Sequence, residues 1–296
     1  MRPRVAYLGP EGTFSEEALL SSAAPGSVEP VAQASIYDTV IALRDGELEW
    51  AVVPIENSLD GSISVTLDLL AEEAGAVQIV GETLLTIRHS LIAARPVDLS
   101  EIDTVLTHPQ VPGQCARFLR SELAHARVIS ASSTAEAVRE VVEDANPGRA
   151  ALGTRLAAEI YGGVVVREGV QDRDDNETRF VWLGRAGRTG REASTPALPR
   201  PAADGVAQRW RTSLVFWGAG ADSPGWLVRC LNEFARRGIN LTKIESRPRR
   251  EQLGHYMVFV DLDGGLRTDR DVSDAIADVR EMCEEARVLG SYPAAS

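Results

Sequence analysis

The chain has 296 residues, of which 44% are hydrophobic and 25% charged, as is typical of a globular protein with one large domain or two to three smaller ones. Its formal net charge of −12 opposes long-range attraction to nucleic acid. Lys243 is the only lysine among 31 cationic side chains, which excludes a Schiff-base lysine, a pyridoxal-phosphate linkage and a P-loop lysine from everything before it.

Cysteine and histidine are sparse and widely spaced. Cys115, Cys230 and Cys283 are odd in number and far apart in sequence, which argues against a disulfide framework and favours a reducing compartment. The four histidines show no paired spacing with each other or with cysteine, so a structural or catalytic zinc site is not expected. The N-terminus leads directly into a strand pattern, and no apolar run has the length of a membrane span. The sequence thus predicts a cytoplasmic protein.

The N-terminal two thirds of the chain repeat one unit, which is a short apolar strand, a polar turn and a helix. The first unit has a strand at 5–8, a turn with two glycines and a proline, and a helix at 15–23. Four further units have strands at 51–55, 104–106, 128–129 and 151–152, with helices that end near 74, 123, 142 and 160. This alternation predicts parallel sheets with helices on their faces, and ligands in such folds bind beyond the carboxyl ends of the strands.

The turns after these strands are rich in Ser, Thr, Asn and Gln, and they allow two interpretations. Helix N-termini surrounded by amides and hydroxyls can hold an anion, yet Ser, Thr and Asn are also ordinary helix caps. Glu56 and Gln114 are harder to explain as caps, because neither type is favoured at that position. Ser90 could face a ligand or fill a strand, and His108 before Pro109 is typical of a hydrogen-bonded turn.

The polar stretch 175–180 lies between two apolar runs, and we interpret it as the mouth of one strand entering the next. It offers a hydroxyl from Thr178, a fixed cation from Arg179 and an aromatic wall from Phe180. The alternative is a solvated turn with incidental charges, which composition alone favours.

Apolar periodicity is lost after residue 184, and 185–210 is predicted to be a flexible linker. The rest of the chain has the pattern of strand, helix, two strands, helix and strand, at 212–217, 224–237, 239–245, 255–262, 271–283 and 286–292. The order βαββαβ predicts a separate ferredoxin-like domain.

Five separated motifs occur together in one order. They are Gly9–Ser15, Pro54–Ser58 with Gly61, His108–Gln110 with Gln114–Cys115, Thr178–Phe180, and Glu245–Pro248. On these motifs the chain resembles the prephenate dehydratase family of the single-function bacterial kind, in which a catalytic domain precedes an ACT regulatory domain. The resemblance covers nearly the whole chain except the linker.

The resemblance implies an α/β catalytic domain of two lobes, like class II periplasmic solute-binding proteins, with the active site between the lobes. It places the catalytic domain at 1–184, with lobe one at about 1–78 and 160–184 and lobe two at about 79–159. The ferredoxin-like ACT domain would occupy 211–296.

The family reaction is a carbon–oxygen lyase (hydro-lyase) step of L-phenylalanine biosynthesis that converts prephenate to phenylpyruvate, with loss of water and carbon dioxide and without a cofactor. The resemblance implies that Thr178 donates a hydrogen bond or relays a proton to the leaving hydroxyl. The other expected catalytic residues are Asn57, Gln114 and Glu56. The expected substrate-binding residues are Arg179 as a carboxylate clamp, Phe180 against the ring, Ser90, Thr107, Ser62 and Thr13. Arg179 could instead be structural, paired with Glu177 or Asp175.

The ACT resemblance implies feedback regulation by L-phenylalanine, bound where two subunits of a homodimer or homotetramer meet. The expected effector-binding residues are Ser223, Pro224, Gly225, Trp226, Leu227, Asn240, Leu241, Glu245, Ser246 and Arg247. Trp226 replaces the alanine of the ACT motif, so its ring either fills the interface or narrows the effector pocket. Thr107 replaces a common serine and keeps the hydroxyl. Two rival functions remain open, an arogenate dehydratase and a non-catalytic, amino-acid-sensing solute-binding protein.

Overall fold

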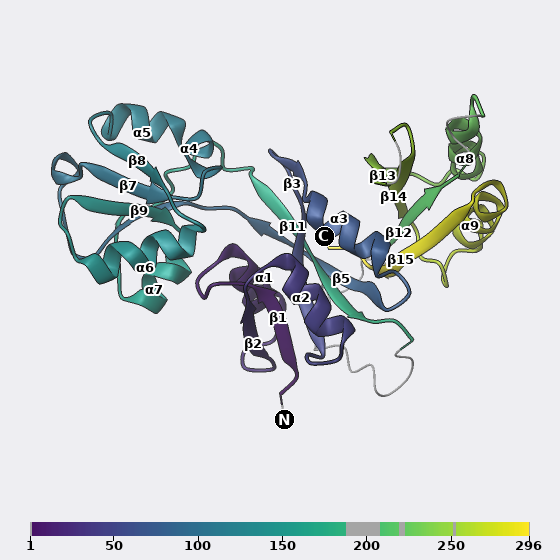
Figure 1. Cartoon of the computed structure of the whole chain (residues 1–296), viewed down its shortest axis with the longest axis horizontal. Helices are drawn as coiled ribbons and strands as arrows, with labels where there is room; N and C mark the ends of the chain where they lie inside the picture. The colour runs from purple at the N-terminus through teal and green to yellow at the C-terminus, as the bar shows by residue number, and fades with distance from the viewer. Residues whose placement is uncertain (1, 188–207, 219–222, 251–252, 296) are drawn as a thin grey trace.

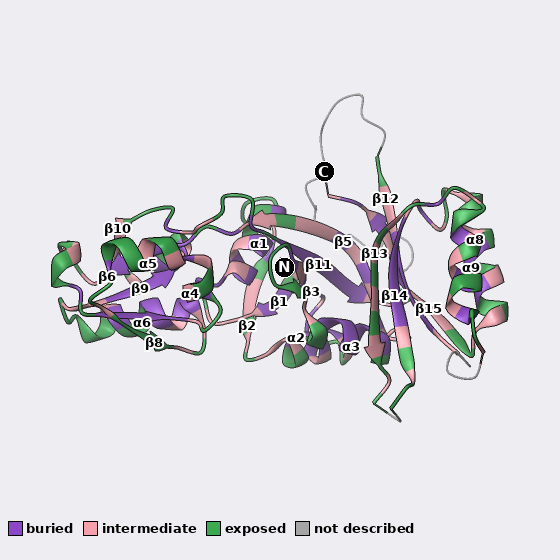
Figure 2. Cartoon of the chain, turned by 90° about the horizontal axis from the view of Figure 1, so that it is seen from above, coloured by how far each residue is buried: buried purple, intermediate pink, exposed green. Residues whose placement is uncertain are grey.

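The computed structural model describes residues 2–187, 208–218, 223–250 and 253–295. They form three parts along one long axis, with a small-sheet lobe at one end, a central lobe, and a C-terminal module at the other end (Figure 1). Each part has buried strands and partly exposed helices (Figure 2). The predicted linker, 185–210, falls mostly outside the described residues.

The central lobe is built on the larger of two sheets. Its strands are β1 (Arg4–Leu8), β2 (Glu29–Gln33), β3 (Trp50–Asn57), β4 (Gly61–Ser62), β5 (Val77–Thr86) and β11 (Glu177–Arg185), and its helices are α1 (Phe14–Ser22), α2 (Ile36–Arg44) and α3 (Ser64–Glu72). β1 pairs in parallel with β2 and β3, as the alternating pattern predicts. β11 lies antiparallel between β3 and β5, so the sheet is mixed where a parallel one was expected. The antiparallel strand β11 is what makes the sheet mixed.

Side chains of the central strands alternate between two hydrophobic cores, because successive residues of a strand point to opposite faces. Val52, Phe180 and Trp182 pack in the core that contains α1. Val53 and Val181 pack in the other core, with α2 and α3. Glu177 already begins β11, so most of the stretch interpreted as a strand mouth is itself strand.

The small-sheet lobe has strands in the order β10-β6-β9-β7-β8. Its elements are β6 (Ser90–Ala93), η1 (Leu99–Glu101), β7 (Thr104–Thr107), α4 (Val111–Gln114), α5 (Ala116–Glu122), β8 (Arg127–Ser130), α6 (Thr134–Asp144), β9 (Arg149–Gly153), α7 (Arg155–Tyr161) and β10 (Val164–Arg167). β7 pairs in parallel with β8 and β9, whereas β6 runs antiparallel to β9 and β10. This sheet is mixed as well.

The chain crosses between the lobes twice, once between β5 and β6 and once between β10 and β11. The expected boundaries near residues 78 and 160 are therefore wrong by several residues. All of β5 belongs to the central sheet, because it pairs with β11 from Val77 to Thr86. β10 belongs to the small sheet through its pairing with β6.

The C-terminal module confirms the predicted βαββαβ order. Its elements are β12 (Trp210–Trp217), α8 (Trp226–Ala235), β13 (Leu241–Pro248), β14 (Tyr256–Asp263), α9 (Arg270–Met282) and β15 (Glu285–Pro293). The strands lie in the order β13-β14-β12-β15, and both helices cover the face away from the central lobe (Figure 1). β15 then continues the central sheet, since Gly290 pairs with Ile79 of β5.

The module and the central lobe share one hydrophobic core. Val215, Phe259 and Leu289 of the module belong to the same buried cluster as Leu67 and Ile79 of the central lobe. The two parts are thus packed as one body, although the sequence predicted a separate module behind a linker.

Two further sequence observations concern cysteine and membranes. All three cysteines are free, but the sulfur atoms of Cys230 and Cys283, distant in sequence, lie 3.9 Å apart in the module. None of the helices in the described ranges combines the length and the apolar character that crossing a bilayer requires.

The backbone contact between β15 and β5 generates a stability prediction. A methyl group on Gly290 would overlap the carbonyl oxygen of Ile79, so Gly290→Ala must push the two strands apart. We expect the free energy of unfolding to fall by about 1–3 kcal/mol, measured by urea denaturation. Gly75→Ala is the matched control, because a methyl group there meets nothing within 4 Å. Equal stability of the two variants would contradict this close packing.

Candidate active site

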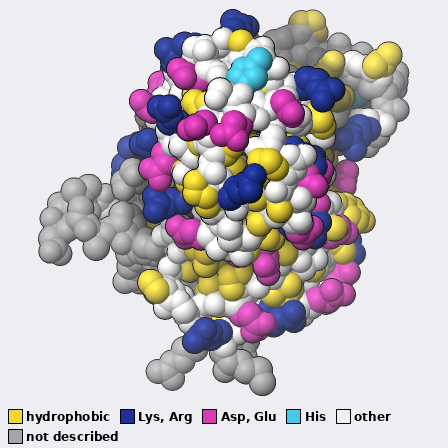
Figure 3. Space-filling model, turned by 90° about the vertical axis from the view of Figure 1, so that its left-hand side faces the viewer, with side chains coloured by type: hydrophobic (Ala, Val, Ile, Leu, Met, Phe, Trp, Pro, Cys, Tyr) yellow, Lys and Arg dark blue, Asp and Glu magenta, His cyan; other side chains and the backbone are white. Residues whose placement is uncertain are grey.

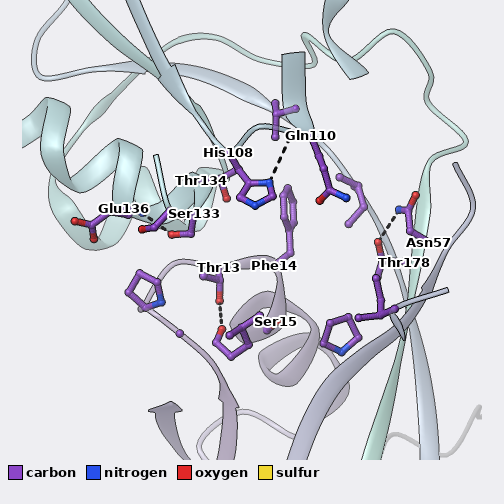
Figure 4. A pocket seen from close by; sticks show the side chains of 18 of the residues that line it. Thr13, Phe14, Ser15, Asn57, His108, Gln110, Ser133, Thr134, Glu136 and Thr178 are labelled. Atoms are coloured by element: carbon purple, nitrogen blue, oxygen red, sulfur yellow. Dashed lines mark hydrogen bonds between the residues drawn. The ribbon is translucent and has the colours of Figure 1, made fainter. Parts of the chain in front are cut away.

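A cavity of about 650 Å³ lies between the two lobes. The turn before α1 and the ends of β3 and β11 line it from the central lobe, and the turns after β7 and before α6 line it from the small-sheet lobe (Figure 4). Its polar lining residues are Thr13, Ser15, Gln33, Asn57, Asp60, His89, His108, Gln110, Gln114, Ser132, Ser133, Thr134, Glu136 and Thr178. This is the position beyond the carboxyl ends of strands that the sequence pattern predicts.

Thr178 and Asn57 face each other across the β3–β11 pair and both line the cavity (Figure 4). The Asn57 Oδ1 atom accepts hydrogen bonds from the backbone N–H groups of Leu59 and Asp60, at 2.9 Å each. This fixes the orientation of the amide, so Nδ2 is the donor toward Thr178 Oγ1 at 2.9 Å. With one lone pair of Oγ1 occupied, the hydroxyl proton of Thr178 is available to another acceptor.

Gln114 ties the two lobes together at the cavity. Its Nε2 donates to the Asp60 carboxylate at 3.0 Å, and its Oε1 lies 3.0 Å from His89 Nε2. Since Asp60 accepts from Nε2, Oε1 must be the acceptor, and His89 carries its proton on Nε2. Asn176 completes a chain of hydrogen bonds, because its Nδ2 donates to Gln114 Oε1 and its Oδ1 accepts from Asn57 Nδ2.

The charge balance of the cavity is unusual for an anion site. Asp60 and Glu136 are its charged lining residues, and no arginine or lysine is among the described residues that line it. Positive potential comes instead from two helix N-termini, those of α1 and α6, whose first residues line the cavity. Thr13 and Ser133 cap these helices by accepting from the N–H groups of Glu16 and Glu136, respectively.

The two histidines of the cavity are kept neutral by their surroundings. Burial lowers the pKa of His89, and its hydrogen bond with Gln114 opposes this only in part. Burial likewise lowers the pKa of His108, whose Nδ1 accepts from the Gln110 N–H.

The end face of the small-sheet lobe is of mixed charge (Figure 3). Seen from the end of the small-sheet lobe, cationic and anionic side chains are interspersed (Figure 3). In the described ranges, no group of three or more His, Cys, Asp or Glu side chains forms an arrangement that could hold a metal ion.

Comparison with known proteins identifies the family. The family model described as prephenate dehydratase matches residues 5–188. A prephenate dehydratase of Mycobacterium sp. (strain KMS) is 38% identical over 98% of this chain and 89% of its own length. The chain belongs to the prephenate dehydratase family. Its reaction is the conversion of prephenate to phenylpyruvate in L-phenylalanine biosynthesis, as the resemblance implied.

Two solved structures resemble the whole chain. The prephenate dehydratase of Arthrobacter aurescens, solved in complex with L-Phe, has a TM-score of 0.84 and 34% identity, covering 98% of this chain and 89% of its own. A protein named GqqA, described as a novel type of quorum quenching acylase, has a TM-score of 0.83 and 26% identity, covering 99% and 98%. The fold therefore also occurs in a protein described by another activity.

Half of the expected catalytic and substrate-binding residues of this prephenate dehydratase family member meet in the cavity. They are Thr13, Asn57, Gln114, Thr178 and Phe180. Phe180 is buried in the α1 core and forms part of the cavity wall.

Glu56, Arg179 and Ser62 were expected at the site, but they are not among the residues that line the cavity. Arg179 follows the alternation of β11 and points to the opposite face from Thr178. Glu56 points the same way as Arg179 because the register of the β3–β11 ladder shifts between Glu56 and Pro54, which skips Ile55. Arg179 bonds to Glu82 and Asp261, and Ser62 accepts a hydrogen bond from Lys243 of the module. The structural alternative for Arg179 holds, but with partners other than Glu177 and Asp175.

Ser90 and Thr107 also lie outside the cavity lining, in the small sheet. Ser90 is buried opposite Gly153 in the ladder between β6 and β9. Thr107 Oγ1 donates to the Leu152 carbonyl at 2.9 Å, so its hydroxyl serves the sheet.

The expected effector residues lie in two places of the module. Ser223, Pro224, Gly225, Trp226 and Leu227 form the turn and first residues of α8, while Asn240, Leu241, Glu245, Ser246 and Arg247 precede or belong to β13. Arg247 faces the central lobe, where its guanidinium bonds to Asp68 and Ser64 of α3. That contact occupies Arg247 and makes it an interface residue within one chain.

Trp226 fills the core of the module. Its indole Nε1 donates to the Met282 carbonyl at 2.8 Å, and its ring meets Phe216 edge-on at 5.9 Å. Trp226 is thus a packing residue, and the surface that its ring packs against is the module's own interior.

Sequence reasoning did not select Asp60, His89 or Asn176 as site residues. Asp60 and Asn176 stand beside selected residues in the same motifs, so a wider reading of those motifs includes them. His89 lies on the crossing between the lobes, far in sequence from Gln114, and only the fold brings the two together.

The neutral His89 generates a pH prediction. In the unfolded chain its imidazole takes up a proton as pH falls below about 6.5, whereas the buried ring resists protonation, so stability is full above that pH and is lost below it. Between pH 7.5 and 5.5 we expect the free energy of unfolding of the wild type to fall more steeply than that of His89→Gln. The difference between the two slopes should reach up to about 1.4 kcal/mol per pH unit.

Urea denaturation across this range measures the effect. Glutamine at position 89 can still donate to Gln114 but does not titrate. His125→Gln, at an exposed histidine, is the control and should follow the wild type. Identical pH slopes for all three proteins would show that His89 is not held neutral by the fold.

Proposed function

We propose that this prephenate dehydratase uses Thr178 to hydrogen-bond the leaving hydroxyl of prephenate. The observation that carries the proposal is the Asn57 amide, which donates to Thr178 Oγ1 and leaves the hydroxyl proton free to point into the cavity. A threonine hydroxyl is too weak an acid to act by ionising, so its effect depends on a fixed position relative to the departing oxygen. The register pair of Thr178 with Asn57 supplies that position.

Gln114 would complete the site as the lobes close on substrate. It comes from the small-sheet lobe, while its partner Asp60 and the Asn57–Thr178 pair come from the central lobe. A substrate bound in the cavity would therefore meet donors from both lobes, and water would be excluded between them.

A cavity lined by no arginine of the described residues has a chemical advantage. Prephenate carries two carboxylates, and one of them must leave as carbon dioxide. A fixed cation would stabilise that carboxylate in the ground state and raise the barrier to its loss. Helix N-termini and hydroxyl groups bind a carboxylate more weakly than a guanidinium does. We assign this binding to the N-termini of α1 and α6.

Arogenate, the transaminated analogue, is a second candidate substrate. The Asp60 carboxylate in the cavity is a group that could pair with the ammonium of arogenate. Incubating the pure protein with each compound and detecting phenylpyruvate or phenylalanine distinguishes the two. An additional assay with an N-acyl substrate tests the activity by which GqqA is described. Turnover of the N-acyl substrate alone would overturn the proposal.

Substitutions at Thr178 test the catalytic assignment. We expect Thr178→Ala to lower kcat by about 10²–10³ with much less change in KM, because the lost hydrogen bond forms mainly in the transition state. Thr178→Ser keeps the hydroxyl and should retain much of the activity. Steady-state kinetics on prephenate measure both. An alanine variant with the wild-type kcat would remove Thr178 from the mechanism.

We also propose that the C-terminal module is an ACT domain that binds L-phenylalanine and lowers activity. Support comes from its βαββαβ order and from the L-Phe complex of the Arthrobacter relative. The turn 223–225 precedes α8 and would receive the effector carboxylate at the helix N-terminus. Asn240 and Leu241 would come from the partner subunit of a homodimer or homotetramer. The three free cysteines of the chain suit a cytoplasmic location.

Calorimetry tests the regulatory proposal. We expect L-phenylalanine to bind the wild type and to lower its activity with a coupling of about 1–3 kcal/mol. Asn240→Ala should weaken this binding and leave kcat unchanged when no phenylalanine is present, because Asn240 is exposed and remote from the cavity lining. D-Phenylalanine is the ligand control. If L-phenylalanine binds neither protein, the module is not its receptor.

A further inference from the structure

The residues next to the catalytic pair face the C-terminal module. In the β3–β11 ladder, Thr178 stands opposite Asn57, and Arg179 stands opposite Glu56. Side chains alternate along both strands, so the first pair points into the cavity and the second points toward the module. A contact made by Glu56 or Arg179 on one face therefore acts one residue away from Asn57 or Thr178 on the other face.

Arg179 is held by the module through buried contacts. Its Nη1 donates to Asp261 of β14 at 2.6 Å and its Nη2 donates to the Tyr292 hydroxyl of β15 at 2.7 Å. Its Nε donates to Glu82 of β5 at 2.7 Å. The side chains of Arg179 and Asp261 are only 8% and 6% exposed, so solvent does not screen this pair as it would at the surface.

Glu56 is also held by the module, with the opposite charge and in a less buried place, since its side chain is 36% exposed. Lys243 of β13, the only lysine of the chain, lies 3.3 Å from the Glu56 carboxylate and also donates to Ser62. Arg179 and Glu56 approach each other at 3.5 Å, which joins the two contacts. The strands β3 and β11, which carry Asn57 and Thr178, are thus each held on their module-facing side by one charged residue of the module.

These charges form one connected set, here called the interdomain charge cluster. Its members are three cations, Arg179, Arg211 and Lys243, and three anions, Glu56, Glu82 and Asp261. Lys243 also lies 3.8 Å from Glu245 of its own strand, which borders the cluster. Arg211 of β12 donates to both carboxylate oxygens of Glu82 at 2.7 Å. A buried charge that loses its partner cannot be compensated by water, so the positions of the members are mutually dependent.

We propose that Asp261 and Lys243 of the module are positioning residues for catalysis. Asp261 fixes Arg179 and Lys243 fixes Glu56, and through the shared backbone they set the register of Thr178 against Asn57. The 2.9 Å hydrogen bond between those two side chains depends on this register. The inference rests on the proposed role of Thr178, and it gives the module a function in the basal reaction, before any effector binds. A displacement of the module would then move the catalytic pair directly.

The experiment compares Asp261→Asn and Lys243→Gln with a matched control, Asp68→Asn. Asp68 of α3 is also a buried interdomain carboxylate, 7% exposed, and it bonds to Arg247 at 2.6 Å and 2.9 Å. None of its hydrogen bonds in the described part of the chain reaches Glu56 or Arg179. The same chemical change is thus made at two places of the same interface. kcat and KM on prephenate are measured for each full-length variant, with the folded fraction determined by circular dichroism.

We expect Asp261→Asn and Lys243→Gln to lower kcat by about ten- to a hundredfold with KM within about twofold of the wild type. Asp68→Asn should keep the wild-type kcat per folded molecule, even if its unfolding midpoint drops. Equal kcat values for all three variants would overturn the proposal and leave the cluster as an adhesive contact only. If Asp261→Asn does not fold, Lys243→Gln decides the outcome alone. Absence of turnover by the wild type would instead refute the proposed function.

Discussion

The antiparallel pairing of β3 with β11 is the constraint on which the rest of the structure depends. It brings residues 57 and 178 opposite each other although more than a hundred positions separate them in the chain. Because side chains alternate along a strand, the same pairing creates two opposite surfaces. One carries Asn57 and Thr178 into the cavity, and the other carries Glu56 and Arg179 to the C-terminal module. The proposed catalytic groups and the interdomain groups are therefore separated by the width of a single sheet.

This arrangement bears on how an anionic substrate is bound when no Lys or Arg of the described residues lines the cavity. The arginine beside Thr178 is directed to the other face, where burial alone would lower its pKa but Tyr292, Asp261 and Glu82 raise it above its usual value. The described cavity lining offers hydroxyl groups, amides, two histidines and helix N-termini, with Asp60 and Glu136 as its charged side chains. Such groups interact favourably with a carboxylate but do not form an ion pair, which suits a reaction that must release one carboxylate as carbon dioxide.

The interface between module and central lobe combines a shared apolar core with buried charges. Apolar burial provides affinity without direction, whereas paired buried charges are costly unless every partner is in place. Removing one partner of such a pair typically costs about 3–5 kcal/mol, so the interdomain charge cluster favours one relative position of the two parts. Such defined relative positions suit the proposed effector-binding role of the module, since coupling between sites requires elements with discrete arrangements.

The sequence by itself determined the family, the βαββαβ module and the strand–turn–helix units, because periodicity and turn residues are local properties that several motifs in order make specific. It also determined Thr178, Asn57 and Gln114 as cavity residues, through motifs. Only the tertiary structure decided which neighbours of these residues share the cavity. Arg179 and Glu56 stand beside site residues in sequence but lie on the other face of the sheet. The stretch 175–180, which the sequence indicates as the mouth of a strand, with a solvated turn as the alternative, is paired with β3 and β5 from Thr178 and Glu177 onward, respectively. His89 and Gln114, or Cys230 and Cys283, meet only through packing between segments. Facing direction and long-range proximity follow from strand pairing, and strand pairing is a property of the folded chain.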